Sequence, residues 1–281
     1  MKHLCRQLIG VDFSSAPTNR KPITVAVGQL IEKRQPVYRL ETIRELPTLE
    51  AFEQLLAEPG DWLGGFDLPF GQPRTLIEHE GWPTDWAAFV RFFCQQPREA
   101  LRETFRRWCA ARPIGNKFAW RQTDKPAGSS PAMRWTNPPV AWMMHAGIGR
   151  MLAAGLAFPA HRHPRRRGRQ QRIALEAYPG FTARQVTRGS YKSDTPASQT
   201  PDRRQRRRQI LTAVTAGTAG LAVRLEASPT WRRRMLADGR GDLLDAVLCS
   251  LQAGHAAVQP RFGLPRDLDP LEGWIAAVPV Q

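Results

Sequence analysis

The sequence predicts an α/β fold in which a mixed sheet is flanked by helices. Three observations predict it. Three β-branched segments follow one another near the start, an amphipathic helical segment and another short strand come next, and the C-terminal third is helical. Strands that alternate with helices are typical of α/β domains. The chain has 281 residues, 42% of them hydrophobic, so we expect residues 1–281 to form a single domain around a substantial core.

The individual elements follow from local patterns. Thr48 is placed to cap a helix in which Leu49, Phe52, Leu55 and Leu56 recur at helical spacing. The three sequential strands at the start form a meander, so we expect the first three strands to be antiparallel. The predicted strands are 7–13, 23–31, 37–43, 61–69 and 173–179, and the predicted helices outside the central segment are 49–58, 202–216, 229–238 and 241–258.

Residues 73–160 differ in character and are predicted to be a helical insertion beside the strand ends. This segment is rich in Trp and Pro, with helical stretches at 84–111 and 139–155 and a polar loop at 112–138. Its tryptophans are expected to pack against other side chains. Stacking on nucleic-acid bases stays open for Trp120 and Trp135, which lie in the loop among basic residues.

The charge is strongly positive and clustered. Lys and Arg number 41 against 25 Asp and Glu, a net charge of +16, and arginines gather at 161–172, 202–209 and 231–235. Guanidinium groups bind phosphate oxygens through paired hydrogen bonds, so the clusters favour nucleic acid, DNA or RNA, as a partner. A solvated basic surface is the alternative, and the sequence leaves it open.

Other features argue against several classes of protein. No apolar run approaches the roughly 20 residues that span a bilayer, and no secretory signal is expected at the N-terminus. The four cysteines are scattered without a CxxC pair, which argues against a disulfide framework and a structural zinc site. We therefore expect a cytoplasmic protein with no membrane partner.

Carboxylates stand where hydrophobic strands end. Asp12 follows LIGV, Asp67 follows WLGGF and Glu176 follows IAL, while Asp242 and Asp245 are spaced to share one face of the last helix. If the strands lie side by side, these carboxylates gather at one edge of the sheet and repel one another unless a hard divalent cation joins them. The pattern predicts a Mg²⁺ or Mn²⁺ site in which all five carboxylates serve as metal ligands and catalytic residues.

The order of several motifs resembles a known family. The segments IGVDFSSAP, GGFDLPFG, EAYPG, SYK followed by DRR, GDLLDAVLCSLQAG and EGWI are similar to those of the domain-of-unknown-function family 429, a group of predicted RNase H-like nucleases. The resemblance touches both ends of the chain and leaves the central insertion largely uncovered. It implies an RNase H-like sheet with metal ligands on the first, fourth and sometimes fifth strands and on a late helix. Those positions here hold Asp12, Asp67, Glu176 and the Asp242/Asp245 pair.

The family resemblance also carries a difference. Many such nucleases have glutamate where this chain has Asp67, so the spacing of the metal ligands is expected to differ. The spacing DxxD at Asp242 and Asp245 resembles that of the Holliday-junction resolvase branch.

The predicted function is a metal-dependent nuclease that hydrolyses phosphodiester bonds of DNA or RNA by a two-metal mechanism. Two other hypotheses stay open: a catalytically inactive RNase H-like protein that binds nucleic acid, and an actin-like or sugar-kinase-type nucleotide hydrolase. Candidate substrate-binding residues, each with a turn, loop or solvated helix face as its alternative role, are Ser14, Tyr191, Lys192, Arg203 and Arg204.

Overall fold

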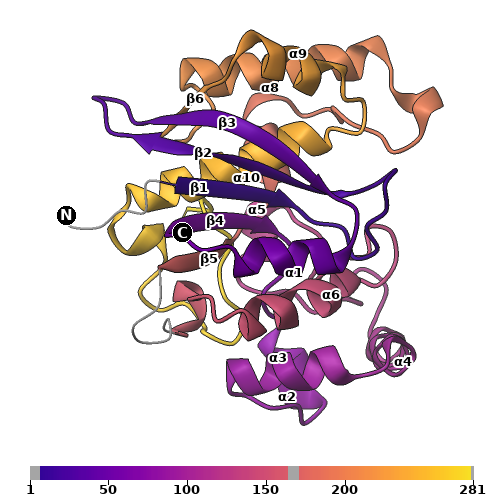
Figure 1. The fold of residues 1–281 in the computed structure, drawn as a ribbon. Coiled ribbons are helices and arrows are strands. Elements are labelled where there is room, and N and C mark those ends of the chain that lie inside the picture. Colours follow the sequence, from indigo (N-terminus) through magenta and orange to yellow (C-terminus); the bar gives the residue numbers. More distant parts are fainter. Residues whose placement is uncertain (1–6, 164–170, 280–281) are drawn as a thin grey trace.

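A mixed β-sheet forms the centre of the molecule (Figure 1). The computed structural model describes residues 7–163 and 171–279. In these residues the sheet has six strands in the order β5-β4-β1-β2-β3-β6. Their bounds are β1 Gln7–Asp12, β2 Ile23–Ile31, β3 Val37–Leu46, β4 Trp62–Asp67, β5 Arg172–Glu176 and β6 Arg224–Glu226.

The directions of the strands set the architecture. Strands β1, β2 and β3 are antiparallel, as predicted, whereas β4 pairs parallel with β1, β5 parallel with β4, and β6 parallel with β3. A parallel pair places equivalent strand ends at the same edge of the sheet. The last residues of β1, β4 and β5 therefore meet at one edge.

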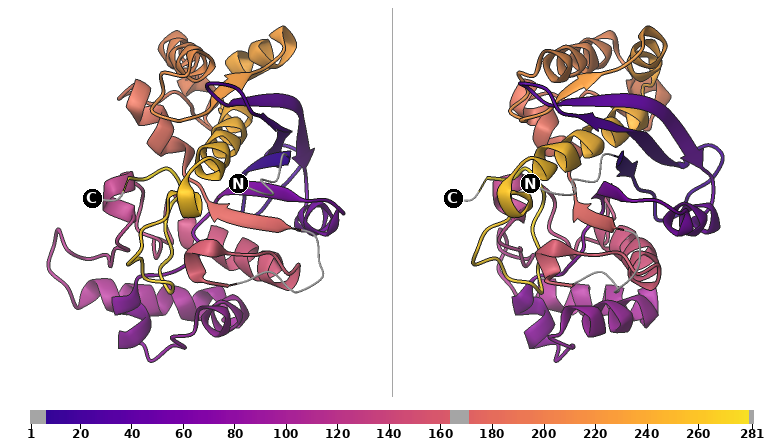
Figure 2. Two further views of the ribbon diagram at one scale, coloured as in Figure 1. Left: turned by 90° about the vertical axis from the view of Figure 1, so that its left-hand side faces the viewer. Right: turned by 60° about the vertical axis from the view of Figure 1, so that its left-hand side comes forward.

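Helices cover both faces of the sheet (Figure 2). Side chains alternate along β1, so that Ile9 and Val11 belong to one hydrophobic cluster and Leu8 to the other. The first cluster lies against α1 (Leu49–Ala57) and α6 (Val140–Ala153). The second lies against α8 (Pro201–Ala216), α9 (Pro229–Ala237) and α10 (Asp242–Ala257). The prediction of an α/β fold with helices flanking a mixed sheet is confirmed.

The Trp-rich segment forms α2 (Arg74–His79), α3 (Trp86–Gln95), α4 (Arg98–Ala110), α5 (Asp124–Ala127) and α6. Its tryptophans pack against other rings, as Trp82 does on Phe89 and Trp135 on Phe105, with ring centroids 6.1 and 5.9 Å apart. Trp135 is therefore a packing residue. Trp120 lies beside Lys125, whose Nζ is 5.8 Å from the ring centroid.

Two glycines allow α10 to lie directly on the sheet. A Cβ atom added to Gly10 of β1 would stand 2.0 Å from the carbonyl oxygen of Ala246, and one added to Gly65 of β4 would stand 2.3 Å from that of Cys249. No side chain fits in this space, so the backbone of α10 packs directly against the backbone of β1 and β4. Helix α10 is buried along nearly its whole length as a result.

Some boundaries differ from the sequence prediction. Pro97 divides the predicted helix 84–111 into α3 and α4, because proline donates no backbone hydrogen bond. The predicted strand 173–179 ends at Glu176, and Pro179 instead begins α7 (Pro179–Val186). The three-residue β6 was not predicted. Short 3₁₀ helices cover Pro159–His161, Pro196–Ser198 and Pro260–Gly263.

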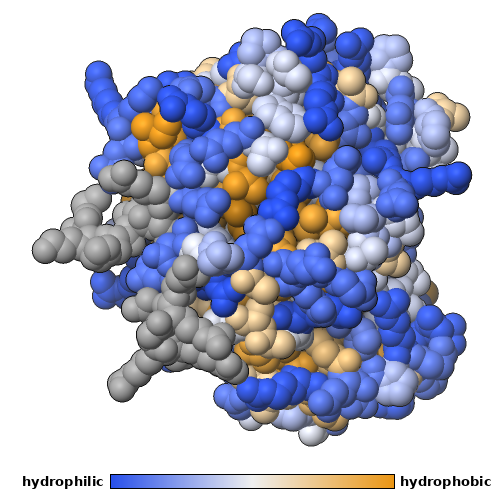
Figure 3. Space-filling view, in the orientation of Figure 1, coloured by the Kyte–Doolittle hydropathy of each residue, from blue (hydrophilic) through white to orange (hydrophobic). Residues whose placement is uncertain are grey.

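The surface is largely hydrophilic on the side seen in Figure 1, with apolar residues gathered towards its centre (Figure 3). None of the helices in residues 7–163 and 171–279 is long and apolar enough to cross a membrane. The cysteines of the described residues, Cys94, Cys109 and Cys249, are free thiols, and Cys5 lies outside them.

Candidate active site

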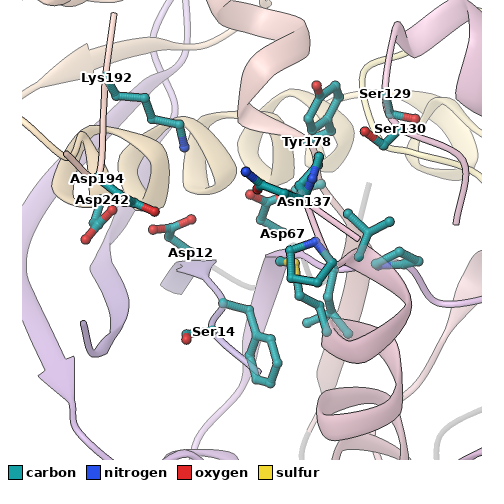
Figure 4. Close-up of a pocket in the computed structure, with 18 of the residues that line it drawn as sticks. Asp12, Ser14, Asp67, Ser129, Ser130, Asn137, Tyr178, Lys192, Asp194 and Asp242 are labelled. Carbon is teal, nitrogen blue, oxygen red and sulfur yellow. The ribbon is translucent and has the colours of Figure 1, made fainter. Parts of the chain in front are cut away.

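Asp12 and Asp67 lie next to each other at the ends of adjacent parallel strands. They are direct partners in the β1–β4 register, which places their backbones about 4.8 Å apart across the sheet. Each lies two residues after a glycine that contacts α10, so both aspartate side chains stand on the α10 face. Figure 4 shows them facing one cavity.

Helix α10 brings two more carboxylates to the same place. Asp242 and Asp245 stand in its first turn, which begins after Gly241 in a left-handed conformation (φ +80°). The N-terminus of a helix carries partial positive charge, which favours carboxylates there. Asp12, Asp67, Asp242 and Asp245, hereafter the acidic cluster, thus come from three elements far apart in the sequence.

Lys192 extends into the acidic cluster from the loop before α8 (Figure 4). Its Nζ donates a hydrogen bond to Asp245 Oδ2, and the Tyr191 hydroxyl donates one to Asp245 Oδ1. Both oxygens of the fully buried Asp245 are therefore engaged by neighbouring side chains. Burial alone would lower the pKa of Lys192, but Asp245, Tyr191 and Asp12 outweigh it, so the pKa is raised and the ammonium stays protonated.

Three arginines of α8 hold this loop in place. Arg203 donates to Ser198 O at 2.6 Å, Arg206 to Ser190 O at 3.0 Å, and the buried Arg207 to Tyr191 O at 2.7 Å. Three of the five arginines in the cluster at 202–209 therefore stabilise the backbone of the loop that carries Tyr191 and Lys192. Sequence reasoning did not predict this structural role.

Glu176 lies at the same edge of the sheet but in a different environment. Both of its oxygens accept hydrogen bonds from Arg121, at 2.6 and 2.8 Å, and the backbone N–H of Phe70 donates to one of them at 3.0 Å. Arg121 also pairs with Asp124 at 2.8 Å. Glu176 is 4% exposed and Arg121 2% exposed, so this is a buried, satisfied ion pair. It joins the Trp-rich segment to β5.

The cavity beside these residues has a volume of about 500 Å³. Asp12, Asp67 and Asp242 form one wall, and Ser14 also lines the cavity. The Trp-rich segment contributes the opposite wall (Figure 4). That wall includes Ser129, Ser130, Asn137, Pro138, Pro139, Val140 and Met143, and Lys21, Arg121 and Arg240 also line the cavity.

The acidic cluster is short of positive charge. Burial raises the pKa of Asp67 to about 7; Lys192 opposes the rise, and Asp245 and Glu176 add to it. Burial also raises the pKa of Asp242, to about 6, with Asp238 adding to the effect. The pKa of Asp12 is raised well above its ordinary value by burial, and the other three aspartates of the cluster add to this rise while Lys192 opposes it.

The donor set fits a hard divalent cation. All four side chains of the acidic cluster are carboxylates, the kind of ligand that suits Mg²⁺ or Mn²⁺. Asp242 is 7% exposed, and its buried Oδ2 accepts no hydrogen bond from the described residues, although Arg240 Nε lies 3.2 Å away. In the described residues, no three Asp, Glu, His or Cys side chains lie close enough to bind one metal ion together. Lys192 lies among the carboxylates instead.

Comparison with protein-family models, with curated proteins and with solved structures finds no match to this chain. The resemblance to family 429 therefore remains a hypothesis that rests on the motifs.

The predicted site residues separate into groups in the structure. The acidic cluster, Ser14, Tyr191 and Lys192 lie in or beside one cavity. Glu176 also lines this cavity, but both of its oxygens are held by Arg121. Arg203 and Arg204 lie on α8 and do not line the cavity. Most of the cluster 161–172 lies outside the described residues. Sequence reasoning did not predict Arg240 and Asn137 as cavity residues: Arg240 lies just outside the GDLLDAVLCSLQAG motif, and Asn137 lies in an irregular loop.

Proposed function

We propose that this protein is a divalent-metal-dependent nuclease, which hydrolyses phosphodiester bonds of DNA or RNA at the acidic cluster. The observation that carries the proposal is the register of β1 and β4, which places Asp12 beside Asp67 under the first turn of α10. The sheet order, with three antiparallel strands followed by parallel β4 and β5, supports the RNase H-like fold expected from the motifs.

The reaction would add water across a phosphorus–oxygen bond. The water oxygen bonds to phosphorus, the ester bond breaks with its electron pair on the leaving oxygen, and that oxygen takes up a proton. A bound Mg²⁺ or Mn²⁺ supplies activation of the water and stabilisation of the leaving oxygen. Asp12, Asp67 and Asp242 would hold the ion, and Lys21 and Arg240 line the cavity where a phosphate would enter.

Nucleic acid is the substrate class that the charge favours. The net charge of +16 and the exposed arginines of α8 and α9 suit a polyphosphate backbone. A cytoplasmic location belongs to the same proposal.

A nuclease assay with a matched variant tests the proposal. The purified protein is offered single-stranded, duplex and branched DNA and RNA with Mn²⁺, Mg²⁺ or EDTA. We expect ion-dependent cleavage of at least one substrate, and we expect Asp12→Asn to abolish it because a neutral amide binds a dication poorly. Asp267→Asn, which neutralises an exposed carboxylate away from the cavity, is the control and should cleave like the parent.

The outcome separates the three hypotheses. Cleavage by Asp12→Asn at the parent's rate would show that the acidic cluster is not the active site. Binding of nucleic acid without cleavage under any of these conditions would favour the inactive binding protein. ATP is offered in parallel under the same conditions, and its hydrolysis without cleavage of nucleic acid would favour the nucleotide hydrolase.

A further inference from the structure

The ammonium group of Lys192 lies among the carboxylates of the acidic cluster. Its Nζ contacts Asp245 and acts electrostatically on Asp12, Asp67 and Asp242, that is, on every member of the acidic cluster. Its position in a loop does not by itself explain why Lys192 points towards these carboxylates. A lysine in such a loop would ordinarily extend into solvent, because its ammonium group is strongly hydrated.

We propose that Lys192 replaces one of the two ions of the expected two-metal site, so that the acidic cluster binds a single divalent ion beside the Lys192 ammonium. This inference rests on the proposed function and deepens it. Asp245, whose oxygens are taken by Tyr191 and Lys192, positions the ammonium, and the ion is left to Asp12, Asp67 and Asp242.

The formal charge of the site supports a single ion. The acidic cluster carries four carboxylates, Lys192 pairs with one of them and Arg240 lies beside another. Four negative and two positive charges leave a formal charge of −2, which one divalent ion neutralises. Oδ2 of Asp242 is buried and accepts no hydrogen bond from the described residues, and its ion-pair partner Arg240 Nε lies 3.2 Å away, so the ion would share this oxygen with Arg240.

The position of Lys192 is built into the fold. The stem of the side chain lies across Gly241, where an added Cβ would stand 2.8 Å from Lys192 Cβ. Arg207 donates to the carbonyl of Tyr191 and fixes the backbone one residue earlier. A glycine, a buried arginine and a tyrosine thus direct the ammonium to the carboxylates.

Titration with Mn²⁺ alone, without substrate, tests the inference by calorimetry. We expect the parent to bind one Mn²⁺ per chain. Lys192→Met keeps most of the stem and removes the charge, so it should bind two ions, or bind the first on the order of tenfold more tightly. Lys192→Arg keeps the charge and should still bind one. Lys33→Met, which removes the charge of an exposed lysine outside the cavity, is the control and should titrate like the parent.

Thermal unfolding supplies a second readout. In EDTA, Lys192→Met should unfold at a lower temperature than the parent because the cluster has lost its cation, and Mn²⁺ should remove this difference. Two ions per chain in the parent, or an unchanged titration of Lys192→Met, would overturn the inference. So would failure of Lys192→Met to fold in Mn²⁺ as well as in EDTA, since an ion would then not replace the ammonium.

Failure of this inference can be told from failure of the proposed function. A parent that binds Mn²⁺ and cleaves nucleic acid, with two ions per chain, would contradict only the role of Lys192. A parent that binds no Mn²⁺ and cleaves nothing would contradict the proposed function and, with it, the single-ion site.

Discussion

The carboxylates at one edge of the sheet differ in how their charge is compensated. Both oxygens of Glu176 are paired with the buried Arg121. Asp12 and Asp67 are also buried, but they lie among other carboxylates and share the ammonium of Lys192. Neutralising an acid should therefore have opposite effects on stability at the two places.

Glu176→Gln should reduce the free energy of unfolding by about 3 kcal/mol, because it leaves part of the buried Arg121 charge without a partner. Asp12→Asn should leave the metal-free protein as stable as the parent or more stable, because it removes repulsion. Urea denaturation in EDTA measures both. A Glu176→Gln variant with parental stability that had lost Mn²⁺ binding would instead identify Glu176 as a metal ligand.

Asp67 should make the metal-free protein less stable as pH rises. Its pKa is about 7 in the folded protein against an ordinary value of 3.8, so the folded state binds this proton more tightly than the unfolded state. The free energy of unfolding then falls as pH rises from about 4 to about 7 and levels off above. In EDTA, Asp67→Asn should gain stability relative to the parent across this range. Asp267→Asn is the control, and a flat difference between parent and Asp67→Asn would contradict the prediction.

At the scale of elements, the site depends on how closely α10 approaches the sheet. Gly65→Ala would place a Cβ 2.3 Å from the carbonyl oxygen of Cys249, and neither backbone can give way easily. We expect a loss of about 2–3 kcal/mol in the free energy of unfolding and weaker Mn²⁺ binding, because the first turn of α10 moves away from Asp67. Gly149→Ala on α6, whose Cβ would meet only the Cys94 side chain at 3.1 Å, should be much milder. Equal effects of the two substitutions on Mn²⁺ binding would contradict this account.

Elements with strong local patterns could be predicted from the sequence, and short ones could not. The three antiparallel strands and α10 each carry enough periodic hydrophobic residues to be recognised. Strand β6 has three residues, too few for an alternation to be distinguished from a loop. Helix α7 begins at Pro179, and prolines are common both at the ends of strands and at the starts of helices. The local pattern therefore does not distinguish the end of a strand from the start of a helix.

The site was predictable to the extent that strand ends determine it. Carboxylates at the ends of neighbouring strands were expected to gather at one edge of the sheet, and the parallel register places Asp12 beside Asp67 there. The partner of Glu176 could not be predicted, because Arg121 lies in an irregular loop whose path depends on tertiary packing. Equally, no local signal distinguishes the arginines of α8 that bind backbone from those that face solvent.

At the scale of the whole molecule, the positive charge should govern affinity for nucleic acid. Arg204 and Arg208 are exposed on α8, and their replacement by alanine should weaken binding equally across sequences. Each lost phosphate contact should reduce the slope of log K against log salt by about one. Arg91→Ala, an exposed arginine of α3 on the other side of the sheet, is the control (Figure 1). An affinity that barely changes with salt would assign these arginines to a solvated surface.

The packing of α10 against Gly10 of β1 and Gly65 of β4 has a consequence during synthesis of the chain. Asp12 and Asp67 are made early, but Lys192 and α10, which compensate and cover them, emerge from the ribosome more than a hundred residues later. Contacts between such distant segments form late in folding. Until then the strand-end carboxylates face water without their helix and without Asp242 and Asp245 beside them. A growing chain attached to its messenger RNA would therefore carry no assembled acidic cluster.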